Sequence, residues 1–174
     1  KRIGDRRDGV LLRDVDAMHF IMPIIYPNRC DNEAFLSERI DLTAAAAYLE
    51  RKNAEDPEYK YNLFQLIVTA MLKTVTLRPK LNRFIANKNL YQRRGVSAAF
   101  VVKKLFSDEG EEGLAFLRVG EEDNLESVHQ EIFRQVSACR GEKNNSTGES
   151  MEFFKKLPRA LSKFLISVVC FLDR

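Results

Sequence analysis

The feature that most constrains the fold is the stretch from Asn62 to Lys104, which predicts one helix, a hairpin and a strand. Asn62 can cap a helix, and Gln65 three positions later can reach back to it, a variant of the capping box. Apolar side chains then recur at helical spacing, at Leu63, Leu66, Ile67, Ala70, Met71, Val75 and Leu77. Pro79 disfavours the α conformation at Arg78, so we expect the helix to end there.

A short hairpin and a longer strand are predicted after this helix. Phe84-Ile85 and Leu90-Tyr91 flank the polar residues 87–89, as the arms of a hairpin flank its turn. The run from Val96 to Val102 is almost wholly apolar and β-branched or aromatic, which is typical of a strand covered on both faces. We expect the helix to lie across this strand, with Leu66, Ile67, Ala70 and Met71 at the contact.

The sequence before this helix predicts an extended segment, a strand and a second helix. Residues 18–26 are apolar but contain Pro23, so we expect an extended segment there and not a helix. The alternation from Glu33 to Asp41 favours a strand, and Thr43 can cap the alanine-rich helix that follows and frays over residues 51–56.

After the central strand, an acidic turn over residues 107–113 leads to a second strand over residues 114–119. Asp123 and Glu126 have capping-box spacing before a helix that carries Val128 and Ile132 and ends at Gly141. The polar residues 142–148 form a loop, and Pro158 splits the remainder into two short helices.

Composition indicates a globular protein in a reducing environment. The 28 basic and 25 acidic residues give a net charge of +3, too balanced to imply a nucleic-acid partner. Basic and aspartate residues interleave near the start, so we expect residues 1–17 to form a charged N-terminal tail, solvated or paired with a neighbouring subunit. Cys30, Cys139 and Cys170 are scattered, which favours reduced thiols and a cytoplasmic location over a zinc site.

Three short motifs, in this order and spacing, carry a resemblance to a known family. They are the run from Ile40 to Thr43, the run from Arg78 to Asn82 after the long helix, and the hairpin that follows. This arrangement resembles the chloramphenicol acetyltransferase-like fold, which also forms the catalytic domain of dihydrolipoyl acyltransferases. The resemblance covers residues 10–172, the first two-thirds of such a domain. It implies an acyl-coenzyme A substrate, a trimeric assembly and, in this chain, a fold truncated at its C-terminal end.

The resemblance transfers no catalytic residue to this chain. The family uses a histidine as general base, in a His-His-x-x-x-Asp-Gly motif, to deprotonate the hydroxyl or thiol that attacks the thioester. The only two histidines, His19 and His129, lack that motif, and His129 borders an apolar stripe as a hydrogen-bonded packing residue does. On the family's pattern Phe100 and Val102 line the substrate channel, although plain core packing explains them as well.

The last segment leaves two interpretations open. Lys155, Lys156, Arg159 and Lys163 precede a nearly continuous apolar run over residues 164–172. Such a helix suits a membrane surface, and it equally suits packing against further parts of the fold or a sister subunit. The run is much shorter than the ~20 residues that span a bilayer, so we expect no transmembrane helix.

These inferences combine into one expectation. We expect an α/β fold, with a mixed sheet and helices packed mainly on one face in an acetyltransferase-like two-layer sandwich, forming a single incomplete domain over residues 1–174. The expected function is that of an acyl-coenzyme A-dependent acyltransferase, a cytoplasmic homo-trimer, with this chain inactive and binding no cofactor or metal. The alternatives are a non-catalytic oligomerising module of the same fold and a peripheral membrane-binding module.

Overall fold

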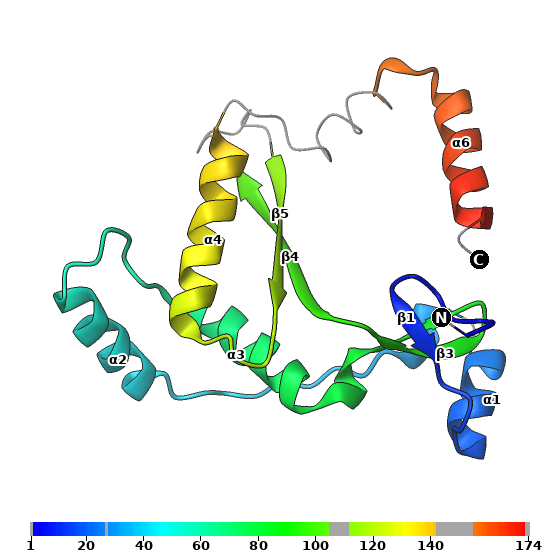
Figure 1. Ribbon diagram of the computed structural model, residues 1–174, viewed down its shortest axis with the longest axis horizontal. Helices are drawn as coiled ribbons and strands as arrows, with labels where there is room; N and C mark the ends of the chain where they lie inside the picture. The colour runs from blue at the N-terminus through cyan, green and yellow to red at the C-terminus, as the bar shows by residue number, and fades with distance from the viewer. Residues whose placement is uncertain (1, 27, 105–111, 142–154, 173–174) are drawn as a thin grey trace. The chain divides into compact units, whose positions relative to one another are not determined.

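The computed structural model describes residues 2–26, 28–104, 112–141 and 155–172. The chain divides into two compact units, one of residues 1–97 with 118–129 and one of residues 98–117 with 130–174. The described residues form α-helices and two small antiparallel sheets, so the chain is α/β as predicted (Figure 1). A single mixed sheet was expected, but no parallel pairing occurs among the described strands, so that part of the prediction was wrong.

The first unit contains a three-stranded sheet in the order β1-β3-β2. Strand β2 (Arg83–Ala86) and strand β3 (Asn89–Arg93) form the predicted hairpin, closed by Asn87 and Lys88. Both turn residues have positive φ, 45° and 62°, as a two-residue type I′ turn requires. Phe84 pairs with Tyr91 in register, and their rings stack with centroids 5.4 Å apart.

The third strand of this sheet comes from the predicted tail. Strand β1 (Gly9–Leu11) pairs antiparallel with β3, so the prediction of a solvated charged tail over residues 1–17 was wrong. The Asp5 side chain, only 5% exposed, organises the segment by accepting hydrogen bonds from the backbone amides of Arg2 and Leu11. Arg13 and Arg94 lie 3.6 and 3.7 Å from its carboxylate. The interleaved charges therefore fold the segment onto the hairpin.

Helix α1 (Ala17–Ile25) occupies the segment that was predicted to be extended. Pro23 is the seventh residue of this helix, so its ring removes only one internal hydrogen bond before the helix ends two residues later. Asp16 caps the helix by accepting a hydrogen bond from the backbone amide of His19. The cap and the buried Pro23 ring offset the proline's cost, which the sequence argument overestimated.

The segment after α1 and a short 3₁₀ helix (η1, Arg29–Asn32) forms no strand between residues 33 and 42. Phe35 and Ile40 are 91% and 77% exposed, so the strand predicted there was wrong, because no described strand supplies hydrogen-bonding partners for it. Helix α2 (Thr43–Ala54) then begins at Thr43. Its N-cap is Leu42 and not Thr43 as predicted, and Asp41, one residue earlier, accepts hydrogen bonds from the amide and the hydroxyl of Thr43.

Helix α3 (Leu63–Leu77) confirms the helix that the sequence predicted most strongly. The capping box is formed, with Asn62 Oδ1 accepting from Gln65 N and Gln65 Oε1 accepting from Asn62 N, both at 3.0 Å. The helix ends at Arg78, and a 3₁₀ helix (η2, Pro79–Asn82) follows it. The buried positions of α3 are Gln65 and Leu72.

The predicted inner face of α3 was wrong at most positions. Ile67 and Met71 are 45% and 64% exposed, and Ala70 is also exposed. Leu72 instead lines a small cavity together with Val119 and Val128. The helix therefore buries its face against the segment 119–128, which lies next to it only in the folded chain.

The second unit has its own core. Strand β4 (Val96–Lys103) and strand β5 (Glu112–Val119) form a two-stranded sheet, most of which lies in this unit. A cluster of Val102, Ala115 and Cys139 is buried, and Phe100 and Val136 pack against it. Val136 and Cys139 belong to helix α4 (Leu125–Arg140), so this helix covers one face of the sheet. Residues at alternate positions of β4 are exposed, with Val101 at 59%, so the strand is not covered on both faces as predicted.

The two remaining described helices follow the predictions except at the cap of α4. Asn124 caps α4 by accepting from the amides of Glu126 and Ser127, one residue after the predicted cap at Asp123. Helix α6 (Arg159–Leu172) follows Pro158, whose carbonyl accepts from Leu161 and Ser162. The predicted loop over residues 142–148 and most of the predicted turn over residues 107–113 lie outside the described residues.

Candidate functional site

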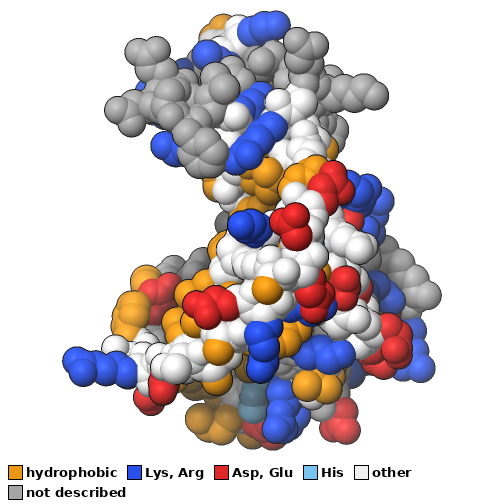
Figure 2. All heavy atoms as spheres, turned by 90° about the vertical axis from the view of Figure 1, so that its left-hand side faces the viewer, with side chains coloured by type: hydrophobic (Ala, Val, Ile, Leu, Met, Phe, Trp, Pro, Cys, Tyr) orange, Lys and Arg blue, Asp and Glu red, His pale blue; other side chains and the backbone are white. Residues whose placement is uncertain are grey.

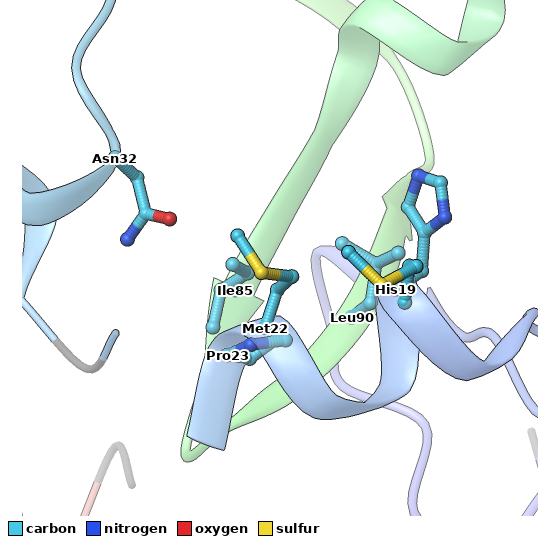
Figure 3. A pocket seen from close by; sticks show the side chains of 7 residues that line it. His19, Met22, Pro23, Asn32, Ile85 and Leu90 are labelled. Carbon is cyan, nitrogen blue, oxygen red and sulfur yellow. The ribbon is translucent and has the colours of Figure 1, made fainter. Parts of the chain in front are cut away.

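A pocket between helix α1 and the β2–β3 hairpin is the strongest candidate site in the first unit. Met22 and Pro23 of α1 face Ile85 and Leu90 of the hairpin, as Figure 3 shows. Met18, His19 and Asn32 complete the lining. The cavity holds about 150 Å³, a volume that accommodates a single aromatic ring when its walls are apolar.

The one titratable side chain in the lining, His19, is held by the helix cap. Asp16 Oδ2 lies 2.6 Å from His19 Nδ1, while Asp16 Oδ1 accepts from the His19 amide at 3.1 Å. The backbone amide of His19 is the main cause that lowers the pKa of Asp16 below its ordinary value. The carboxylate therefore directs His19 Nε2 outward, the orientation of a histidine paired with an acid. Sequence analysis missed this pair, although Asp-x-x-His at a helix start is a visible capping signal.

The side chains of the pocket do not form the buried base and the oxyanion-binding donors that acyl transfer requires. The pair is exposed, with side-chain exposures of 57% for His19 and 65% for Asp16, so water screens it. Both hydrogens of the Asn32 amide are used, because Nδ2 donates to the carbonyls of Tyr26 and Asn28. An oxyanion needs preorganised donors aimed at it, and the lining side chains other than His19 are apolar or, at Asn32, already donate to backbone carbonyls. The pocket is therefore suited to holding an apolar group and not to activating a carbonyl.

The second histidine, His129, is a packing residue, as predicted. It is 6% exposed, its ring stacks on Tyr61 with centroids 3.9 Å apart, and its Nδ1 lies 3.0 Å from Gln65 Oε1. Burial is the main cause that lowers the pKa of His129 below its ordinary value. The histidine is enclosed by protein, so it cannot serve a substrate from solvent.

A more polar cavity of about 240 Å³ lies beside this histidine, lined by Tyr48, Lys52, Tyr61, Asn124, Leu125 and Glu126. Lys52 Nζ is 3.8 Å from a Glu126 carboxylate oxygen and 5.8 Å from the Tyr61 ring centroid. Glu126 is the main cause that raises the pKa of Lys52. Because the two charges neutralise each other and Asn124 already caps α4, this cavity has no net attraction for an anion.

Phe100 and Val102, the predicted substrate-binding residues, lie on β4 in the second unit. Val102 is buried in the cluster with Ala115 and Cys139, and Phe100 is half-buried against that cluster. Neither lines the pockets described above. The structure places both in hydrophobic packing, the second of the two interpretations that their sequence allowed.

The described residues also bear on metals and thiols. No group of three or more His, Cys, Asp or Glu side chains in the described part of the chain is arranged to hold a metal ion. Cys139 is buried, whereas Cys30 and Cys170 are exposed.

Comparison with known proteins identifies no relative: the chain matches no protein-family model, no curated protein and no solved structure. Within the described residues, the helices are too short or too polar to cross a membrane.

Proposed function

We propose that the chain is the scaffold portion of an acyl-coenzyme A-dependent acyltransferase, whose general base lies outside these 174 residues. The observation that carries the proposal is the local geometry of the motifs on which the resemblance rests. Asp41 accepts hydrogen bonds from both polar groups of Thr43 at the start of α2, and the turn from Pro79 to Asn82 follows the end of α3. The hairpin β2–β3 follows at once. Each motif thus has a distinct local structural role, which supports the proposal.

The environments of the two histidines support the proposal that the general base lies outside this chain. Transfer from a thioester needs a base within hydrogen-bond reach of the acceptor and donors for the oxyanion. His129 is buried against Tyr61. His19 is exposed to solvent, and the Asn32 side-chain amide in the same pocket already donates both of its hydrogens to backbone carbonyls. We therefore propose acyl-coenzyme A as a substrate of the complete protein. In this proposal the chain forms the scaffold, and a residue outside it transfers the proton.

A thiol-release assay tests this proposal. Acetyl-coenzyme A is offered with a panel of thiols, amines and alcohols, once to the 174-residue chain and once to the full product of the gene that encodes it. We expect turnover from the full product and none above the uncatalysed rate from the chain. Turnover by the chain that His19→Ala or His129→Ala abolishes would contradict the assignment of the base. Turnover by neither would favour the non-catalytic alternative.

A non-catalytic oligomerising module is the second candidate, and one observation favours it specifically. Phe35, Leu36 and Ile40 are 91%, 93% and 77% exposed in a segment without helix or strand. Figure 2 shows hydrophobic side chains reaching the surface between charged ones on the face that it presents. Contiguous exposed apolar residues mark protein interaction sites, so this segment is a candidate contact in a homo-oligomer, for which we propose a trimer.

A further inference from the structure

We propose that helix α6, with the residues just before it, binds the surface of an anionic lipid membrane. The helix runs from Arg159 to Leu172 and separates its side chains by type. At 100° per residue, Arg159, Lys163, Ser167 and Cys170 fall along one face, on which Ile166 is the one large aliphatic side chain. The opposite face is apolar and consists of Leu161, Phe164, Leu165, Val168 and Phe171.

The structure leaves this apolar face largely open to solvent. Phe164 is 65% exposed, Phe171 is 74% exposed and Val169, at the edge of the face, is 61% exposed. The basic side chains Arg159 and Lys163 are exposed as well. A helix with an exposed apolar face and a basic polar face can lie in the boundary between lipid headgroups and acyl chains, where both faces are satisfied.

Charge identifies the lipid. Between residues 155 and 172 the chain carries four basic side chains, Lys155, Lys156, Arg159 and Lys163, and no acidic one. Without these four, the rest of the chain has 24 basic residues against 25 acidic ones, so the positive charge is concentrated in this segment. Basic residues beside an inserted apolar face are attracted to acidic headgroups such as phosphatidylserine.

Geometry and charge also argue against other occupants. A helix of 14 residues is about 21 Å long, too short for the ~30 Å hydrocarbon core, so it lies on the membrane and does not cross it. A second copy of α6 packed on the apolar face would cover that face but would supply no counter-charge to the basic side chains on the opposite face. An anionic bilayer supplies both the apolar phase and the counter-charge. This inference is independent of the proposed acyltransferase role, because it uses only the residues of α6 and the two lysines, Lys155 and Lys156, that precede it.

Co-sedimentation with vesicles tests the proposal. The chain is mixed with phosphatidylcholine vesicles and with vesicles that contain about 30% phosphatidylserine, and the bound fraction is measured at low salt and in about 0.5 M NaCl. We expect binding to the anionic vesicles that is at least tenfold tighter, and that high salt weakens. Reversing all four charges, K155E/K156E/R159E/K163E, should weaken binding by about a hundredfold. F164S/F171S should weaken it by about tenfold or more without changing the net charge.

A matched variant, K60E/K80E/K88E/K103E, controls for net charge, because it reverses four exposed lysines elsewhere. It should keep most of the binding, and circular dichroism should show all variants to be folded. Equal binding to neutral vesicles, equal loss in the control variant, or no binding to anionic vesicles would overturn the proposal. The proposal would also be overturned if the chain self-associates in the absence of lipid and F164S/F171S abolishes that association. The apolar face of α6 would then be covered by a second copy.

Discussion

At the residue scale, a single amide oxygen connects two helices that are distant in sequence. Gln65 Oε1 accepts from the backbone amide of Asn62 at 3.0 Å and lies 3.0 Å from His129 Nδ1. That oxygen can only accept, so the His129 ring donates to it through Nδ1 in the tautomer that carries a proton there. Tyr61 stacks against the ring, and Asn53 binds both backbone polar groups of Tyr61. The start of α3 and the first turn of α4 are thereby tied together.

We predict that this arrangement makes stability depend on pH through His129. Its pKa is lowered in the folded chain, mainly by burial, and a hydrogen bond to the Tyr59 backbone and the nearby Glu126 oppose that shift only partly. A group with a depressed folded pKa contributes stability above its unfolded pKa of about 6.5, and that contribution is lost as pH falls below it. The melting temperature should therefore fall between pH 7.5 and pH 5.5, in a scan taken at about 0.5-unit steps.

The control for this prediction is His129→Gln, which keeps a donor but cannot titrate. The variant is expected to be less stable than the native chain at pH 7.5, because it loses the ring stack on Tyr61. Its melting temperature should change less over the same pH range, since the lowered pKa values of Asp5, Asp16 and Asp41 act in more acidic solution. Parallel pH profiles for the two proteins would show that His129 is not the group responsible.

At the scale of the element, α3 shows how a helix can have the right pattern and a different buried face. Seven apolar residues follow helical spacing, yet Met71 is 64% exposed and Leu72 is 5% exposed. The stripe is broad enough to present two faces, and the segment carrying Val119 and Val128 covers the one that includes Leu72. The buried face of α3 was selected by its neighbours.

We predict that Leu72→Ala costs about 2–5 kcal/mol in the free energy of unfolding, since it removes a buried side chain and leaves a cavity. Met71→Ala, on the adjacent exposed position, should stay within about 0.5 kcal/mol of the native value. Urea denaturation of the two variants gives both numbers. A larger loss for Met71→Ala than for Leu72→Ala would mean that α3 buries the face predicted from its sequence, and that the packing described above is incorrect.

At the scale of the whole molecule, the chain exposes unusually continuous apolar segments. Phe35 and Leu36 are more than nine-tenths exposed, in a stretch where the described backbone has no strand partner. Exposed backbone and apolar side chains in one extended segment form a template for pairing with another chain.

We predict that the isolated chain, of 20.1 kDa, self-associates through this segment. Light scattering at rising concentration should give a mass above that of one chain, with a trimer as the expected limit. Phe35→Ser with Leu36→Ser should restore the mass of a monomer, whereas Phe164→Ser with Phe171→Ser, in α6, should not. A sharp monomer at high concentration, with cooperative unfolding and no binding of a hydrophobic dye, would refute the prediction.

Much of the local structure could be predicted from the sequence, because it depends on residues only a few positions apart. Asn62 and Gln65 cap α3 through atoms three residues apart, and Pro79 ends the helix through its own ring. The hairpin around Asn87 and Lys88 is equally local. Of the candidate site, sequence alone identified His129 as a packing residue but missed the cap that Asp16 forms with His19.

Tertiary structure decided everything that depends on a partner distant in sequence. Charge alternation alone could not show that residues 9–11 pair with β3, because Asp5 finds Arg94 only in the folded chain. The pocket that Met22 and Leu90 line exists only where α1 meets the hairpin. The sequence by itself determined where α3 and the β2–β3 turn begin and end, since backbone hydrogen bonds and proline geometry act over a few residues. Folding alone determined which faces are buried, because an apolar side chain gains stability from any apolar neighbour and its pattern does not specify which one.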